Sequence, residues 1–120
     1  MRCLSPKIRH LKRLQEFPRL RTLIFTRSGL KRLDALKPLT TLQSLSIDYT
    51  RVSDLKPLQS IPGLKELVIS NTRVRHLRPV ASLNKLQALT AWNAPIRDLS
   101  PLSKLNSLEH LVLGGTRVRS

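Results

Sequence analysis

The chain has 120 residues, enough for one modest domain, and 40% of them are apolar. Leucine dominates the apolar set, while Phe, Trp and Tyr supply only 3% of the chain, which argues against the aromatic-filled core of a sandwich or α/β domain and favours a narrow, layered interior. The 22 basic and 7 acidic residues give a formal net charge of +15, which bears on binding partners rather than on fold.

Targeting features and disulfides have little support in the sequence. Cys3 has no second cysteine with which to form an internal disulfide, and a single thiol is compatible with a reducing compartment. The first ten residues have no apolar stretch of the signal-peptide kind, and no apolar run approaches 18 residues. We therefore expect no membrane span and favour a cytoplasmic location.

A spacing of 22 residues between apolar positions runs through the whole chain. With Leu42 as position 1, apolar residues occupy positions 4, 6, 11, 14, 17 and 20 in almost every repeat. Because chance does not keep six phased positions over this length, we expect a single solenoid over residues 1–120. Its units are a partial repeat (1–19), full repeats 20–41, 42–63, 64–85 and 86–107, and a partial repeat (108–120).

Each repeat, taken in chain order, predicts the same two elements. Positions 4 and 6 alternate with polar or small residues at positions 3, 5 and 7, which predicts a short strand with one buried face. Strands of successive repeats are expected to pair in parallel at ~4.8 Å. Positions 11, 14 and 17 are spaced by three, which suits an extended turn followed by a 3₁₀ or short helical return.

The predicted helical segment that connects one strand to the next begins with residues that favour a helix start. The prolines at position 16 fall where a first helical turn tolerates Pro, and they are Pro57, Pro79 and Pro101. Asp54 and Asp98 at position 13 are expected to cap this turn. Arg32 and His76 occupy the same position in two other repeats, where we expect weaker capping.

This pattern resembles the leucine-rich-repeat superfamily, whose unit is L-x-x-L-x-L-x-x-(N/T)-x-(I/V)-x-D-(I/L)-x-P-L-x-x-L-x-x, and it is most similar to the short 22-residue class of bacterial internalins. The resemblance covers all 120 residues and implies an α/β repeat solenoid. In that fold, a leucine-rich-repeat arc has a parallel β-sheet on its concave face and short 3₁₀, helical or extended turns on its convex face. The resemblance implies a general binding scaffold and raises a bacterial origin, without naming a partner.

Position 9 departs from the family pattern, which often has Asn there to form an amide ladder with neighbouring backbone. Thr50, Thr72 and Thr116 occupy it here, with Ser28 and Ala94 in other repeats. A hydroxyl is expected to replace part of the ladder, whereas Ala94 makes no hydrogen bond through its side chain.

The strand residues that point away from the core are expected to line the concave face. The only Trp and the only Tyr of the chain fall there, and both residue types are favoured at the centres of protein interfaces. The chain is therefore predicted to bind a protein or peptide, without enzymatic activity, through Trp92, Tyr49, Asp48, Ser70, Asn71, Asn93, Val68 and Glu66. The alternatives are that Trp92 covers the rim of its own core and that the Tyr49 hydroxyl bonds to backbone.

Basic residues gather at positions 10 and 12, on the turn after each strand. They are Lys7, Arg9, Lys31, Arg51, Arg73, Arg75, Arg97, Arg117 and Arg119. The alternative function is binding of nucleic acid or another polyanion through this edge, by Arg51, Arg73, Arg75, Arg97, Arg117 and Arg119. The competing interpretation is a solvated edge whose long side chains cover the turn.

Catalytic and metal chemistry have little support. The histidines, His10, His76 and His110, lack a second ligand at metal spacing, and Cys3 has no evident general base. We expect no enzyme activity, no metal and no cofactor. Neither end of the pattern has a polar cap, which predicts a longer parent protein, or an open strand edge that is covered by a partner or by self-association. The competing interpretation is that the high positive charge keeps the ends of separate molecules apart.

Overall fold

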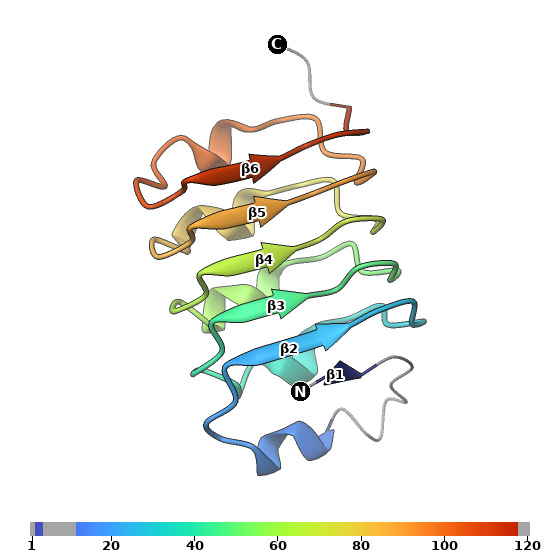
Figure 1. Ribbon diagram of the computed structural model, residues 1–120, viewed down its shortest axis with the longest axis vertical. Coiled ribbons are helices and arrows are strands. Elements are labelled where there is room, and N and C mark those ends of the chain that lie inside the picture. Colours follow the sequence, from blue (N-terminus) through green and yellow to red (C-terminus); the bar gives the residue numbers. More distant parts are fainter. Residues whose placement is uncertain (1, 4–11, 118–120) are drawn as a thin grey trace.

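Six short strands form one parallel sheet, in which their spatial order follows the chain (Figure 1). The computed structural model describes residues 2–3 and 12–117. Every strand pairing joins residues 22 apart, as where Leu67 lies between Leu45 and Leu89. The predicted register is therefore confirmed. The strands are β1 (Arg2–Cys3), β2 (Thr22–Phe25), β3 (Ser44–Ser46), β4 (Glu66–Val68), β5 (Ala88–Thr90) and β6 (His110–Val112).

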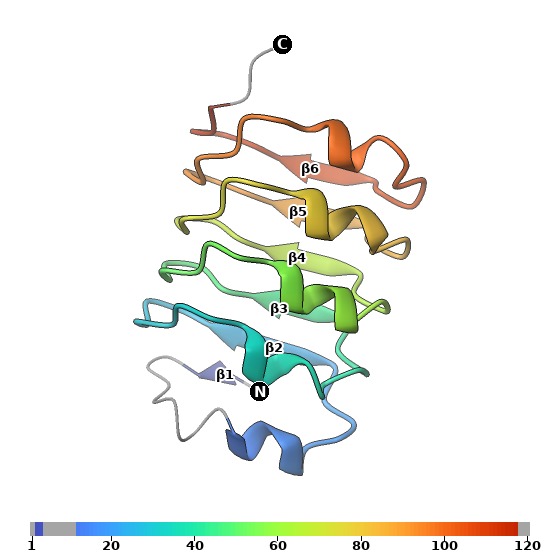
Figure 2. The same ribbon diagram turned by 180° about the vertical axis from the view of Figure 1, so that it is seen from behind.

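A layer of short 3₁₀ helices covers one face of the sheet, and Figure 2 shows it from the helix side. Each predicted return is a 3₁₀ turn closed by bonds such as Leu58 N–H to the Leu55 carbonyl at 2.9 Å. Pro57, Pro79 and Pro101 each lie in the first turn of their helix, as expected. The helices are η1 (Lys12–Glu16), η2 (Asp34–Leu36), η3 (Lys56–Ser60), η4 (Arg78–Ser82) and η5 (Ser100–Leu102).

The position-13 aspartates cap two of these turns. Asp54 Oδ1 accepts the Lys56 backbone N–H at 2.9 Å, and Asp98 Oδ1 accepts the Ser100 backbone N–H at 2.9 Å. In the described part of the chain, Arg32 and His76 make no equivalent bond, since neither side chain presents a carboxylate. The prediction of capped and uncapped turns is confirmed.

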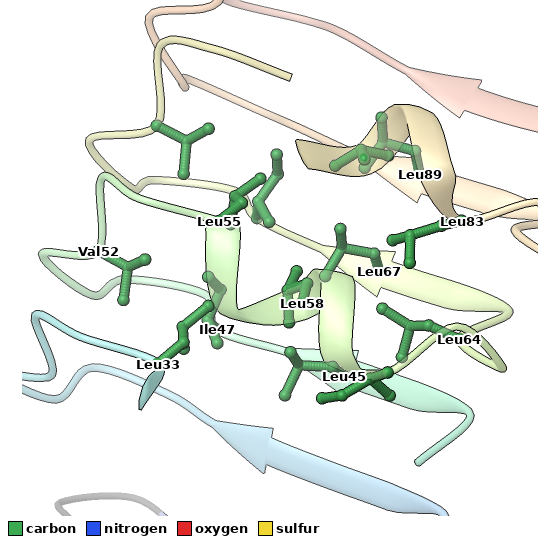
Figure 3. Close-up of a cluster of buried hydrophobic side chains, with 14 of the residues drawn as sticks. Leu33, Leu45, Ile47, Val52, Leu55, Leu58, Leu64, Leu67, Leu83 and Leu89 are labelled. Carbon is green, nitrogen blue, oxygen red and sulfur yellow. The ribbon is translucent and has the colours of Figure 1, made fainter. Parts of the chain in front are cut away.

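The core is a continuous column of aliphatic side chains between the sheet and the helices. Leu45 and Leu67 come from the strands and meet Leu55 and Leu58 from the helical side (Figure 3). Full burial of one such leucine stabilises the fold by roughly 1.5–3 kcal/mol. The column is more open at β6, where Leu111 is 40% exposed. The stacking of identical layers therefore supplies the stability, as expected for a solenoid.

The position-9 hydroxyls of Thr50 and Thr72 are buried and close their own turns. Thr50 Oγ1 donates to the Ile47 carbonyl at 2.9 Å, and Thr72 Oγ1 donates to the Ile69 carbonyl at 2.7 Å. Ala94 is simply packed in the core. The hydroxyls therefore bond within one repeat rather than forming a ladder between repeats.

Candidate functional site

The face of the sheet opposite the helices, here called the exposed sheet face, carries the side chains of positions 3, 5, 7 and 8. Trp92 follows β5 on this face and is 49% exposed. Its ring lies across Gly114 of the next repeat, so a Cβ added at Gly114 would overlap the ring. The Trp92 backbone N–H donates to Ser70 Oγ at 3.0 Å. The indole is thus presented to solvent from a fixed backbone.

Ser70 differs from its predicted place among the exposed polar contacts. Its side chain is buried, with 5% of the residue exposed, and its hydroxyl accepts the Trp92 N–H. The strand alternation used for the prediction ends at Val68, so Ser70 lies in the turn, where a small residue is tucked beneath the next repeat. Ser70 positions Trp92 and is not itself available to a partner.

Every described residue of the position-8 column adopts left-handed backbone, which sequence reasoning missed. The φ angles are +52° at Arg27, +56° at Tyr49, +54° at Asn71, +55° at Asn93 and +72° at Gly115. Asn and Gly tolerate this region, and their recurrence in one column was the available indication. Arg and Tyr do not favour it, so both are held there at a cost in backbone strain.

A ladder of side-chain hydrogen bonds joins three of the predicted contact residues. Asn93 Nδ2 donates to Asn71 Oδ1 at 3.1 Å, and Asn71 Nδ2 donates to Asp48 Oδ1 at 3.1 Å. The ladder is closed on one side by Gly115, since a Cβ there would overlap Asn93 Oδ1. The polar groups of this face are therefore fixed in orientation by each other.

Tyr49 lies at the other side of the ladder, with Arg27 over its ring. The guanidinium carbon of Arg27 is 5.3 Å from the ring centroid, within the range of a cation–π contact. Tyr49 remains 49% exposed. Arg27 was not among the predicted contact residues, although the 22-residue period places it beside Tyr49 in the same column.

Val68 and Glu66 belong to β4, at the start of the exposed sheet face. Val68 is half-buried between Ser46 and Thr90, its partners in register. Glu66 is exposed and accepts a long hydrogen bond from the Ser44 hydroxyl at 3.5 Å. These two residues extend the face along the strands, away from the aromatic side chains.

The predicted basic residues lie on the turns after the strands, along one edge of the solenoid. Arg51, Arg73, Arg75, Arg97 and Arg117 are all exposed there. The backbone fixes this arrangement, since the Arg73 N–H donates to the Val52 carbonyl of the preceding repeat at 2.9 Å. Lys7, Arg9 and Arg119 lie outside the described residues.

Within residues 2–3 and 12–117, no cluster of three or more His, Cys, Asp or Glu side chains is arranged to hold a metal ion. The same part of the chain contains no helix long and apolar enough to span a membrane.

Similarity to known proteins is found only among solved structures. No protein-family model matches the sequence, and no curated protein matches it. Internalin C2 of Listeria monocytogenes is 30% identical, with a TM-score of 0.86 over 95% of this chain and 49% of that one. The internalin inlF of the same bacterium is 29% identical, with a TM-score of 0.86 over 98% of this chain and 36% of that one.

A third structure, the functional domain of InlJ from Listeria monocytogenes, is 15% identical with a TM-score of 0.71, over 89% of this chain and 28% of that one, and supports the fold alone. The chain spans about half or less of the length of each of these proteins. The more similar pair is bacterial, which agrees with the origin that the repeat class favours.

Proposed function

Because the chain is a leucine-rich-repeat protein with repeats similar to those of the internalins, we propose that it is a protein-interaction module that holds a protein or peptide on its exposed sheet face. One observation carries the proposal: the Trp92 ring is half exposed and lies across Gly114 of the next repeat. Trp is the residue type most often found at the energetic centre of an interface.

The fixed surroundings of Trp92 favour binding because little conformational freedom is lost when a partner docks. Its backbone is held by the bond to Ser70, and Gly114 leaves the space in which the ring lies. The backbone that presents the Trp92 side chain is therefore positioned before a partner arrives.

Tyr49 offers a second aromatic contact two repeats from Trp92, about 10 Å away by the strand spacing. The ladder of Asp48, Asn71 and Asn93 runs from the repeat of Tyr49 to the repeat of Trp92 and offers amide and carboxylate groups to the polar backbone of a partner. An apolar contact on each side of a polar strip suits an extended peptide or a protein loop.

The backbone of Tyr49 supports its role as a contact residue. Tyr is disfavoured at φ +56°, where Asn71 and Asn93 stand in the following repeats. A strained, exposed aromatic costs of order 1 kcal/mol, and such strain is concentrated at functional positions. The proposal assigns no catalytic role to Asp48 or Glu66.

The test selects peptides from a random display library on the unaltered chain and measures their affinity for variants. Trp92→Ala and Tyr49→Ala should each weaken binding by about 30-fold, equivalent to ~2 kcal/mol. Gln59→Ala, which alters an exposed residue of η3 on the opposite side, should leave affinity unchanged. Peptides that keep full affinity for both aromatic variants would show that this face is not the site.

A further inference from the structure

A row of hollows follows the edge formed by the turns after the strands. The described cations at positions 10 and 12 are here called the basic edge, and they are Lys31, Arg51, Arg73, Arg75, Arg97 and Arg117. One hollow of about 400 Å³ is lined by Arg75, His76, Arg97 and Arg117, with Pro95 and Asp98 completing its wall. Neighbouring hollows are lined by Arg73 with Arg75, and by Arg51 with Arg73. The cations therefore surround spaces rather than projecting from a flat surface.

Three carboxylates line these hollows, and each interacts with a group outside the basic edge. Asp54 and Asp98 accept backbone N–H groups at 2.9 Å in capping η3 and η5. Asp34 pairs with Lys37 at 3.8 Å. In the described part of the chain, no ion pair within 4.0 Å joins an arginine of the basic edge to a carboxylate. Among the described residues, the guanidinium groups of the basic edge are thus not directly paired with a carboxylate, and the cations outnumber the three aspartates that line the hollows.

The spacing of the basic edge is imposed by the solenoid. The backbone N–H groups of Arg51 and Arg117 donate to the carbonyls of Leu30 and Ile96 in the preceding repeats, at 2.8 and 3.0 Å. Successive rungs therefore follow one another at ~4.8 Å, and the edge presents charge along a line. A linear polyanion matches such a line better than a single small anion does.

The residue types indicate which polyanion. Five of the six cations are arginines, whose planar fork matches phosphate oxygens in a bidentate manner. No Trp, Tyr or Phe lines the hollows of the described edge, so unpaired bases have no surface on which to stack. A duplex keeps its bases paired and presents only its phosphates.

We propose that the basic edge binds the phosphate backbone of a nucleic-acid duplex without reading its sequence, with a phosphate seated in the hollow between Arg75, Arg97 and Arg117. This site is separate from the exposed sheet face, so the two proposals stand or fall independently. Phosphate neutralisation releases counterions, which makes the affinity fall as salt rises.

The experiment measures binding of mixed-sequence duplex DNA by fluorescence anisotropy across a salt series. Contact with about three phosphates gives a slope of log affinity against log salt near −3. The double variant Arg75→Gln/Arg97→Gln should reduce the magnitude of that slope by about two. The control Lys85→Gln/Lys104→Gln removes the same charge from exposed residues outside the basic edge and should keep the slope.

Two further arms decide between related explanations. Trp92→Ala should bind the duplex as the unaltered chain does, and duplexes of different sequence should bind alike. If both double variants lost the same affinity and the same salt slope, overall charge alone would explain the binding. That result would overturn the proposed site. Tighter binding of single strands, or binding of heparin without binding of duplex, would overturn the assignment of the ligand.

Discussion

The indole ring of Trp92 lies across Gly114, which follows it by 22 residues and occupies the same position in the next repeat. This contact depends on the absence of a side chain at Gly114, because an added Cβ would overlap the ring. Gly114 is not among the residues with positive φ, so its backbone accepts Ala without strain. The role of Gly114 is therefore to leave room for the Trp92 ring, and not to adopt a special backbone conformation.

Gly114→Ala is expected to displace the ring while leaving the fold largely intact. The overlapping atoms belong to the Trp92 ring, which is half exposed and can shift toward solvent, so the thermal midpoint should change little. The emission of Trp92, the only Trp in the chain, should change in wavelength or intensity. Gly63→Ala is the control, since nothing lies within 4 Å of its added Cβ. Identical emission from both variants would contradict the contact.

The amide ladder gives a prediction about Asn71, which both donates to Asp48 and accepts from Asn93. Asn71→Gly removes both side-chain hydrogen bonds but tolerates the φ of +54°. Asn71→Ala loses the same bonds and adds left-handed strain, so it should be less stable than Asn71→Gly by about 1 kcal/mol. Chemical denaturation measures the difference. Equal stability of the two variants would argue against a strained backbone at this position.

The contact between Arg27 and Tyr49 is tested by a double-mutant cycle with alanine. Both single variants keep a non-glycine residue in the left-handed region, so the backbone strain largely cancels in the cycle. At this exposed site the coupling energy should be about 0.5–1 kcal/mol. Unfolding of the four proteins in denaturant provides the measurement, and additive effects would show that the two side chains do not interact in solution.

The repeat period predicted the sheet and the core because it determines which residues become lateral neighbours. Leu45, Leu67 and Leu89 recur at one phase of the 22-residue unit, and a one-residue slip would expose all three. The caps at Asp54 and Asp98 could be predicted equally well, since they require only contacts within a turn.

The details of the candidate site were harder to predict from the sequence because they lie beyond the ends of the strands. Alternation placed Ser70 outward, but the strand ends at Val68 and the following turn directs Ser70 inward. The contact of Arg27 with Tyr49 depends on side chains that cross between repeats from left-handed backbone. A column with both large residues and Asn or Gly does not by itself predict that conformation.

Asp98 provides a prediction for the pH dependence of stability. The backbone N–H of Ser100, and next its hydroxyl, hold the pKa of the Asp98 carboxyl below its usual value of 3.8, and Arg78 adds a smaller effect. A carboxyl with a lowered folded-state pKa stabilises the fold fully above its unfolded pKa, and this contribution is lost as pH falls through the folded value.

The comparison that isolates this effect is between the unaltered chain and Asp98→Asn, which keeps an oxygen acceptor but does not titrate. The advantage of the unaltered chain in thermal midpoint should be constant above about pH 5 and should shrink below pH 3.8. Ser100→Ala should retain most of this dependence, because the backbone N–H is the larger cause and survives the substitution. A difference in midpoint that stays the same down to pH 2 would mean that the Asp98 carboxylate is not held by this turn.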